Sequence, residues 1–292
     1  MDKKNKIFIT ASAMCLIGGL QFSILKIALS YFDSEIMFLW ARFLFAFIAA
    51  FIFARIKKLT LPKDKAVIFL SLVHPLCAFY FQSIGAAKSD VMVISVVTAL
   101  FPAVASLFAF ISGEETLSVK GWFSITGIVI GGLICAFFGK PGGSFFGTGV
   151  LYLFISIILR GVYYVLVHKM SVNRSCYEIS YAQITYSFIG YSLIAVIFGK
   201  FDLSFVRYMP LSGWAALLYM GVISTTASYI LNNYLLSSLR VSVSGALAAV
   251  TFIINLFAAS FINGEELNLW IYAGSAVVIV CIIILTRERR KN

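Results

Sequence analysis

The chain has few charged residues. Asp, Glu, Lys and Arg make up 12% of its 292 residues, roughly half their share in a soluble domain, whereas hydrophobic residues make up 61%. The mean hydropathy is +0.98, and apolar runs about as long as a bilayer is thick recur along the chain. This composition excludes a soluble protein. Because the apolar runs do not alternate with polar residues, they predict transmembrane helices and not a β-barrel.

Signals for metals and disulfides are also missing. The five cysteines are scattered, odd in number and never spaced as C-x-x-C, and all but Cys176 lie in apolar runs. We expect small buried hydrophobic residues here, with no disulfide, no metal site and no other cofactor. The first apolar segment is too long for a signal peptide and no small-residue cleavage site follows it, so we expect it to stay in the protein.

No carboxylate lies near the middle of a predicted helix. This absence argues against the simplest drug–proton antiport, which uses a buried carboxylate. It also argues against a membrane-embedded enzyme, which needs a nucleophile with its base or a set of metal ligands. His74 is a candidate for proton coupling, because it is the only histidine well inside a predicted helix. The alternative, which is more common for a lone histidine beside a proline kink (here Pro75), is a hydrogen-bonded structural role.

What the chain does contain is ten apolar segments of helical length. We predict helices over about 7–29, 34–54, 66–86, 89–111, 119–138, 147–168, 178–198, 213–235, 241–262 and 268–286. The loops between them are short, and none is long enough to hold a separate soluble domain.

Positive charge is distributed unevenly between the loops, and the formal net charge is +11. If the N-terminus is cytoplasmic, sixteen Lys and Arg fall in cytoplasmic segments and four in external ones. By the positive-inside rule we expect both termini in the cytoplasm. This distribution explains the basic composition without a nucleic-acid partner.

One stretch of sequence occurs twice. Residues 89–115 and 240–266 are offset by 151 positions, and each ends in Gly-Glu-Glu. The Gly-rich segment 139–144 divides the chain into a first half, 1–140, and a second half, 141–292, with five predicted helices each. Because five is odd, the second half enters the membrane in the opposite orientation. Many secondary transporters have this arrangement, with the substrate site near the midplane between the halves.

The two Gly-Glu-Glu ends are expected to terminate helices. Gly113 and Gly264 would end their helices, and the carboxylates would lie before or within the first turn of the next helix, where the helix dipole favours them. A paired-carboxylate active site is the less favoured alternative, because the two pairs face opposite sides of the membrane.

Several short motifs follow one another in the order and spacing of a known family. They are Gly18-Gly19 with Lys26, Arg42-Phe43, the run 86–114 with Pro102 before Gly113-Glu114, the run 221–225 with Asn232, and Gly264-Glu265. Over nearly the whole chain they resemble the drug/metabolite transporter superfamily and, within it, the EamA-type ten-helix exporters. The resemblance implies a basket of helices around a central cavity, with the fifth and tenth helices peripheral. It also implies transport of small metabolites such as amino acids or drugs.

The sequence departs from that family pattern in three places. Ile253 stands where the family usually has a proline equivalent to Pro102, and the first helix lacks the usual tryptophan before its glycines. Arg160 replaces an apolar or aromatic residue of the sixth helix, which suggests a difference in substrate. Pro102 and Pro75 are candidate hinges for alternating access, because proline removes a backbone hydrogen bond from its helix.

Three cations lie inside predicted helices, where charge is costly and therefore suggests function. Lys26 lies near the outer end of its helix, where snorkelling to the headgroups is the simpler explanation. Arg42 is either an anchoring or paired residue or a substrate ligand. We expect Arg160 to line the cavity; the alternative is hydrogen bonding to carbonyls of a neighbouring helix. An anionic group on the substrate is a candidate partner for these cations.

Polar and aromatic residues complete the predicted substrate site. Most Ser and Thr side chains are expected to bond their own helix or to join helices together. Besides Arg160 and Arg42, the candidates are Tyr163, Gln183, Thr225, Tyr229 and Asn233 in the second half and Gln21, Tyr80 and Gln82 in the first.

Together these features predict an all-α membrane protein with ten transmembrane helices in two inverted five-helix repeats. The expected function is secondary transport of a small polar metabolite, either an amino acid or related compound or a drug, through a central midplane cavity by alternating access. Export is expected from the family resemblance alone. We expect a monomer or homodimer in the bacterial cytoplasmic membrane. The alternatives are a membrane-embedded enzyme and a lipid scramblase or assembly subunit.

Overall fold

The structure is a computed structural model that describes residues 3–116, 118–138 and 147–288, and the regular structure of these residues is entirely helical. The first half contains α1 (Lys3–Leu29), α2 (Glu35–Lys57), α3 (Lys65–Ser71), the π-helical segment η1 (Leu72–Cys77), α4 (Ala78–Ala87), α5 (Val91–Ala99), α6 (Phe101–Ile111) and α7 (Val119–Phe138). The second half contains α8 (Thr148–Met170), α9 (Cys176–Ile197), α10 (Phe205–Tyr208), α11 (Leu211–Leu218), the π-helical segment η2 (Tyr219–Ala227), α12 (Ser228–Ser238), α13 (Val241–Asn263) and α14 (Leu269–Glu288). The predicted linker 139–144 lies outside the described residues.

Helices of membrane-spanning length account for most of the described chain. Six are long and apolar enough to cross a bilayer: Lys4–Leu29, Glu35–Lys57, Lys65–Ala87, Val91–Ile111, Thr148–Met170 and Leu211–Ser238. Shorter apolar helices cover Val119–Cys135, Val250–Asn263 and Leu269–Leu285. The chain is therefore an all-helical membrane protein, as the long apolar runs predicted.

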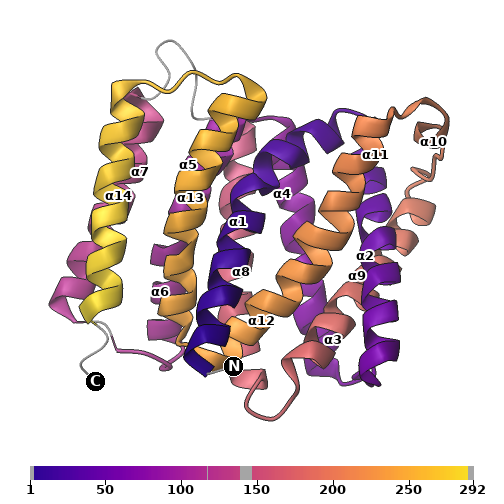
Figure 1. The fold of residues 1–292 in the computed structure, drawn as a ribbon, viewed down its shortest axis with the longest axis horizontal. Coiled ribbons are helices and arrows are strands. Elements are labelled where there is room, and N and C mark those ends of the chain that lie inside the picture. The colour runs from indigo at the N-terminus through magenta and orange to yellow at the C-terminus, as the bar shows by residue number, and fades with distance from the viewer. Residues whose placement is uncertain (1–2, 117, 139–146, 289–292) are drawn as a thin grey trace.

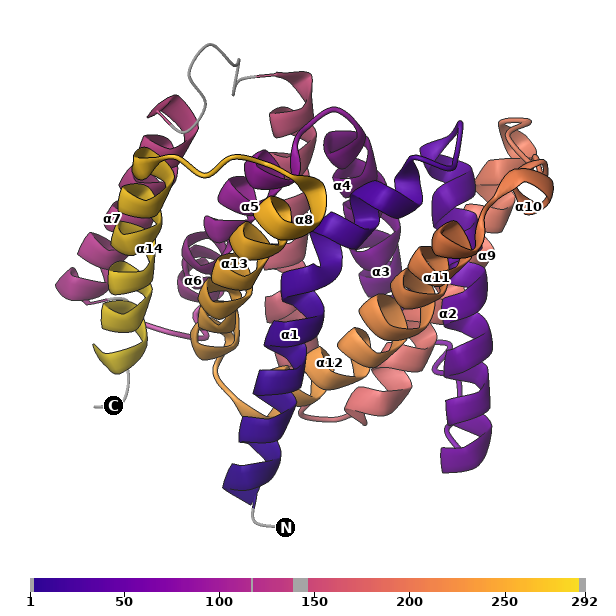
Figure 2. The ribbon, with the colours of Figure 1, turned by 45° about the horizontal axis from the view of Figure 1, so that its top comes forward.

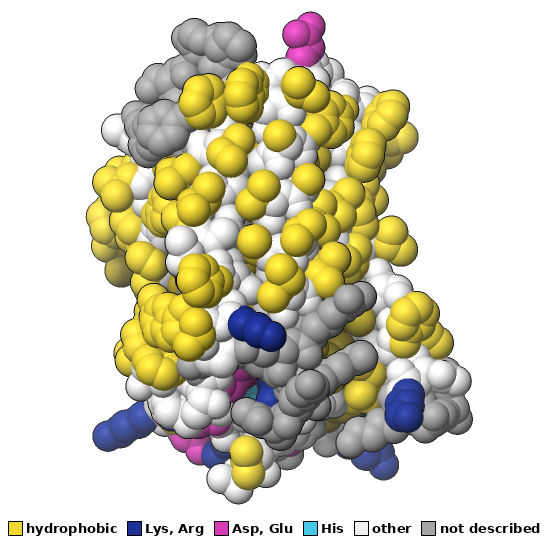
Figure 3. Space-filling model, turned by 90° about the vertical axis from the view of Figure 1, so that its left-hand side faces the viewer, with side chains coloured by type: hydrophobic (Ala, Val, Ile, Leu, Met, Phe, Trp, Pro, Cys, Tyr) yellow, Lys and Arg dark blue, Asp and Glu magenta, His cyan; other side chains and the backbone are white. Residues whose placement is uncertain are grey.

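The helices α7 and α14 stand side by side at one edge of the molecule (Figures 1 and 2). Their backbones touch, because a Cβ atom on Gly131 would lie 2.8 Å from the carbonyl oxygen of Gly274, and one on Gly274 would lie 2.6 Å from that of Gly131. This pair contains the fifth and tenth predicted helices, which the family resemblance placed at the periphery. On this edge, hydrophobic side chains cover most of the surface and Lys and Arg gather toward the lower end (Figure 3). The N- and C-terminal ends lie at the same end of the molecule (Figure 1).

Two of the predicted helices are interrupted. The predicted helix 89–111 consists of α5 and α6, which meet at Leu100. Pro102 therefore lies in the first turn of α6 and not within a continuous helix; in a first turn the missing N–H costs little. The predicted helix 66–86 is broken at His74, whose backbone is extended (φ −149°, ψ 118°), and the His74–Pro75 peptide bond is cis. Hinge motion at either proline stays a prediction.

The two Gly-Glu-Glu ends do terminate helices. Gly113 (φ 73°) follows α6 and Gly264 (φ 70°) caps α13, both in the left-handed conformation that glycine adopts without strain. Their carboxylates act at helix N-termini, but not at those of the helices that follow them. Glu265 accepts hydrogen bonds from the backbone N–H groups of Val91 and Met92 at the start of α5, both at 2.8 Å.

The first half makes the reciprocal contact. Glu115 Oε1 accepts a hydrogen bond from the backbone N–H of Ser242, at the start of α13, at 3.0 Å. Each half thus caps a helix of the other half. The N-terminal N–H groups of a helix have no partner within the helix, and in a protein surrounded by lipid the nearest acceptor satisfies them whatever its place in the sequence.

We predict that Glu265→Ala lowers the free energy of unfolding by about 1–2 kcal/mol, because two backbone N–H groups lose a charged acceptor. Thermal unfolding of the detergent-purified protein measures this effect. Glu266→Ala is the matched control, because Glu266 is exposed, and it should change stability by less than about 0.5 kcal/mol. Equal losses in the two variants would contradict the capping role.

Candidate functional site

A cavity lies between the two halves of the chain. The space between its lining residues, counted together with the open space at its mouth, is about 460 Å³. The first half contributes lining residues from α1, η1 and α4, and the second half from α8, η2 and α12. The lining residues are Met14, Gln21, His74, Phe79, Gln82, Ser156, Arg160, Tyr163, Ser224, Ser228, Tyr229 and Asn232.

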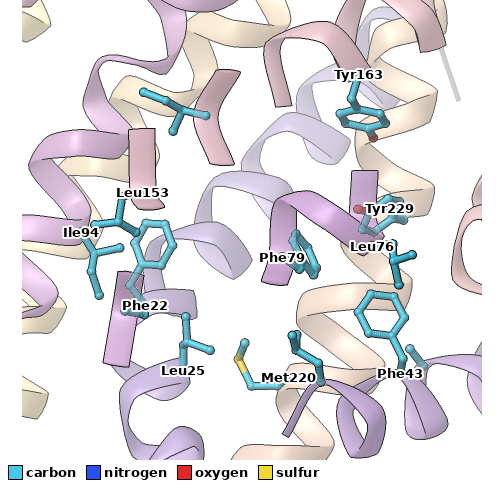
Figure 4. Packing of buried hydrophobic residues seen from close by; sticks show 14 of the residues in the cluster. Phe22, Leu25, Phe43, Leu76, Phe79, Ile94, Leu153, Tyr163, Met220 and Tyr229 are labelled. Atoms are coloured by element: carbon cyan, nitrogen blue, oxygen red, sulfur yellow. The ribbon is translucent and has the colours of Figure 1, made fainter. Parts of the chain in front are cut away.

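One wall of the cavity is aromatic. The imidazole of His74 stacks on the ring of Tyr163, with centroids 4.2 Å apart and planes inclined by 10°. The hydroxyl of Tyr229 lies 2.6 Å from His74 Nδ1, and the ring of Phe79 packs edge-on against the imidazole at 5.2 Å. Figure 4 shows Tyr163, Tyr229 and Phe79 gathered near Leu76. The wall is held by contacts between rings from four helical elements, η1, α4, α8 and α12.

The position of His74 follows from the helix break. An extended residue inside a helix leaves carbonyl groups without helical partners, which is costly in lipid. Three side chains of α9 satisfy such groups. Gln183 Nε2 donates to His74 O at 3.0 Å. The Tyr191 hydroxyl donates to Leu76 O at 2.6 Å, and Ser187 Oγ donates to the carbonyl oxygen of residue 71 at 3.3 Å.

A chain of hydrogen bonds runs behind the aromatic wall. The hydroxyl of Tyr164 donates to Asn232 Oδ1 at 2.8 Å, and Asn232 Nδ2 donates to the hydroxyl of Tyr163 at 2.9 Å. The Tyr163 hydroxyl in turn donates to Asn233 Oδ1 at 2.6 Å. These bonds fasten α8 to α12.

The chain of hydrogen bonds continues into α9 and into the helix that is broken at His74. Asn233 Nδ2 donates to Ser180 Oγ and to Gln183 Oε1, both at 2.8 Å, and Gln183 then donates to His74 O. Every group between the ends both accepts and donates, so each bond polarises the next. The buried polar residues of three helices are thereby joined into one rigid support for the cavity wall.

Arg160 is the cation on the cavity wall. It is partly buried near the middle of α8, and its guanidinium lies over the rings of Phe101 (4.6 Å) and Tyr164 (5.8 Å). Within the described part of the chain its contacts are with these rings, and it forms no ion pair or hydrogen bond. The lining residues include no carboxylate. The rings compensate part of the cost of burying its charge.

Arg42 lies just behind the wall and is fully buried, with 0% of its surface exposed. Its Nε donates to Thr225 Oγ1 at 2.8 Å, and its guanidinium lies 4.4 Å from the ring centroid of Phe79. Its two terminal amino groups have no hydrogen-bond partner. The close approach of η2 to α2 requires Gly221, because a Cβ there would lie 2.8 Å from Arg42 O.

The predicted site residues fall into two groups. Those that border the cavity are Gln21, His74, Gln82, Arg160, Tyr163 and Tyr229. The others lie elsewhere: Asn233 and Gln183 belong to the hydrogen-bonded chain, Thr225 holds Arg42, and Tyr80 packs edge-on against the ring of Phe81.

The sequence prediction did not include several lining residues. They are Met14, Phe79, Ser156, Ser224, Ser228 and Asn232. In an α-helix Thr225 would share a face with Tyr229, four residues later, and we predicted it as a site residue for that reason. The π-helical turns of η2 are wider than α-helical turns, and Ser224 and Ser228 border the cavity instead. No sequence signal marks Phe79 among 28 phenylalanines.

Lys26 has a different role from snorkelling to the headgroups. Its Nζ donates to Ala86 O at 2.8 Å and Ser89 O at 2.7 Å, where α4 ends. It therefore satisfies carbonyl groups at a helix C-terminus, where positive charge is favourable.

Comparison with known proteins adds the family context. A model of the "EamA-like transporter family" matches residues 5–137 and 147–287. The "Uncharacterized transporter YcxC" of Bacillus subtilis (strain 168) is 26% identical over 288 residues, covering 94% of this chain and 91% of that protein. A solved structure titled "Crystal structure of protein" superposes with a TM-score of 0.71 at 13% identity, covering 94% of this chain and 98% of the other. At that identity the likeness concerns the fold alone.

We predict that Asn233→Ala lowers the free energy of unfolding by about 2–4 kcal/mol, because the buried Tyr163 hydroxyl and Gln183 amide each lose a partner. Thermal unfolding in detergent measures the loss. Asn173→Ala, which changes an exposed loop residue, should leave the melting temperature nearly unchanged. An equally small change of melting temperature in both variants would show that the chain of hydrogen bonds does not support the cavity wall.

Proposed function

The chain belongs to the EamA-like transporter family. Because it belongs to this family, we propose that it is a secondary transporter of a small polar organic metabolite. Transport proceeds by alternating access through the cavity between the halves. The repeats correspond to residues 1–140 and 141–292, inserted in opposite orientations with both termini cytoplasmic. The protein acts in the cytoplasmic membrane of a bacterium as a monomer or homodimer, and the family resemblance favours export.

The observation that carries this proposal is the composition of the cavity. Residues from both halves line it, and Arg160 sits on its wall near the middle of a membrane-spanning helix. Ionisable residues at such positions mark the path of a solute, because their burial is otherwise unfavourable. Sites between two repeats at the midplane are usual in secondary transporters.

The reciprocal carboxylate caps support alternating access. Glu265 holds the start of α5, and Glu115 holds the start of α13. α5 and α13 begin at opposite ends of the molecule (Figure 1). In our proposal the two contacts open alternately, so that the cavity faces one side of the membrane at a time. Pro75 and Pro102 are the proposed hinges between the moving segments.

His74 is the proposed coupling residue. Among the residues that line the cavity, it is the only one whose side chain ordinarily titrates near neutral pH. When Nδ1 of His74 carries no proton, it accepts the hydrogen bond and the Tyr229 hydroxyl donates it. Once Nδ1 is protonated it becomes a donor, and the hydroxyl must turn so that its oxygen accepts. A change in the charge of His74 is thus linked to the geometry of the wall.

We predict that the purified protein, reconstituted in vesicles, carries a radiolabelled solute from a panel of amino acids, drugs and organic anions. Arg160→Gln should lower this flux at least about tenfold, because it removes a charged ligand of the solute. Arg207→Gln makes the same change at an exposed position and should keep the flux.

The melting temperature of each variant is measured beside the flux, so that unfolding is not mistaken for loss of binding. No flux for any member of the panel would contradict the proposal. Fluorescent lipids in the same vesicles test the scramblase alternative, which requires lipid movement without solute flux.

A further inference from the structure

We infer that the solute is an organic anion without a balancing amino group, bound by Arg160 in the present conformation and by Arg42 once Phe79 moves aside. This inference rests on the proposed transport function and specifies its substrate class. It differs from the amino acids and drugs that the family resemblance implies, because it requires a net negative charge.

The charge of the cavity wall is the first step. Arg160 contributes a positive charge, and the other lining residues are neutral side chains together with His74. The guanidinium of Arg160 is held by ring contacts and makes no hydrogen bond to a described residue. Its planar set of N–H donors is therefore available to a ligand, and a carboxylate, sulfonate or phosphate matches that geometry.

The same wall offers an ammonium group no charged partner. A carboxylate would be the usual partner of an ammonium group, and no lining residue supplies one. Aromatic faces are the other common partner, but the nearby faces are already used. His74 stacks on Tyr163, and the ring of Phe79 carries Arg42. A zwitterionic amino acid would find only neutral acceptors for its ammonium group, such as the unpartnered Gln82 Oε1 and the hydroxyls of Ser224 and Ser228. Without a carboxylate, the positive charge of that group would stay unbalanced in a low-dielectric site.

The second step concerns Arg42. A fully buried guanidinium with two unpartnered amino groups is strongly unfavourable, and Thr225 compensates only its Nε. Arg42 does not border the cavity, whereas Phe79, on whose ring it lies, does. Figure 4 shows Phe79 on the same side of the cluster as Tyr229 and Leu76, with Phe43 below. Phe79 therefore separates the unpaired amino groups from the cavity.

Movement of one side chain would join the two cations. Phe79 is the second residue of α4 and lies five residues after His74, where the helix is broken. A rotation of this ring would expose the amino groups of Arg42 to an anion already held by Arg160. The solute could then pass from one arginine toward the other, and the cost of burying Arg42 would be offset only while the anion is bound.

A matched series of ligands tests the substrate class. The probes are 3-phenylpropionate, phenylalanine and 3-phenylpropylamine, which share one skeleton, and the aliphatic set butanoate, 2-aminobutanoate and butylamine, which share another. Binding to the purified full-length protein at pH 7 is measured by thermal shift, because a ligand of the folded state raises the melting temperature. We expect an anion of at least one set to bind about tenfold or more tightly than its zwitterionic counterpart, and the amines to be weakest.

Binding of an amino acid or amine as tight as that of the matching acid would overturn the inference. If vesicles carry amino acids or drugs while every acid fails to bind, the inference fails and the proposed transport function stands. If no solute is carried by the vesicles, both fail.

Variants of Arg160 locate the first site. Arg160→Gln should weaken binding of the preferred acid about 10- to 100-fold. Arg160→Lys, which keeps the charge, should restore binding to within about tenfold of the original chain. Arg207→Gln, an exposed charge change, serves as the control and should bind normally. Equal binding by Arg160→Gln and the original chain would overturn the assignment.

Variants of Arg42 test the second site. Arg42→Met should raise the melting temperature, because it replaces an unpaired buried charge with an apolar side chain, and should slow acid transport at least about tenfold. A lower melting temperature together with unchanged transport would show that Arg42 is structural. Phe79→Ala provides an independent measurement: it should tighten butanoate binding severalfold, and the double variant Phe79→Ala/Arg42→Met should lose that gain. An equal gain in both would remove Arg42 from the proposal.

Discussion

The structure depends on one requirement of the lipid environment: a helix that breaks inside the membrane must find partners for its freed carbonyl groups. The break at His74 is satisfied by side chains of α9, chiefly Gln183 and Tyr191. Gln183 is in turn held by Asn233, which continues the chain of hydrogen bonds into α12 and α8. The imidazole of His74 is thereby placed on the cavity wall. The break in the helix, and the side chains that bond its freed carbonyl groups, thus determine the shape of the candidate site.

The basic residues of the protein are satisfied in contrasting ways. Lys26 donates to carbonyl groups at the end of α4, and Lys169 pairs with Glu114 at 3.4 Å, so both have protein partners. Arg160 and Arg42 instead rest against aromatic rings. Ring contacts offset part of the desolvation cost but leave N–H donors without acceptors. Two arginines with unused donors, beside a cavity with no carboxylate on its wall, are the physical basis of the functional proposals.

The two Gly-Glu-Glu sequences connect the halves through carboxylates that do not correspond to each other in the repeated sequence. With an offset of 151 residues, Glu265 corresponds to Glu114, yet the carboxylate that caps α13 belongs to Glu115. The reciprocal caps therefore use neighbouring and not equivalent residues. Glu114 is occupied with Lys169 of α8. This inequality, and the presence of Ile253 at the position 151 residues after Pro102, are differences between the two halves of the chain.

The sequence by itself determined the helical membrane class, the approximate helix positions and the helix ends at Gly113 and Gly264. These features depend on hydropathy and on local backbone conformation, both of which are readable over short stretches of the chain. Only the tertiary structure decided that Thr225 holds Arg42, that Glu265 caps α5 and that Arg42 lies over the ring of Phe79, which borders the cavity. Those contacts join residues far apart in sequence, and the wide turns of η2 alter which side chains face inward, so helical spacing could not predict them.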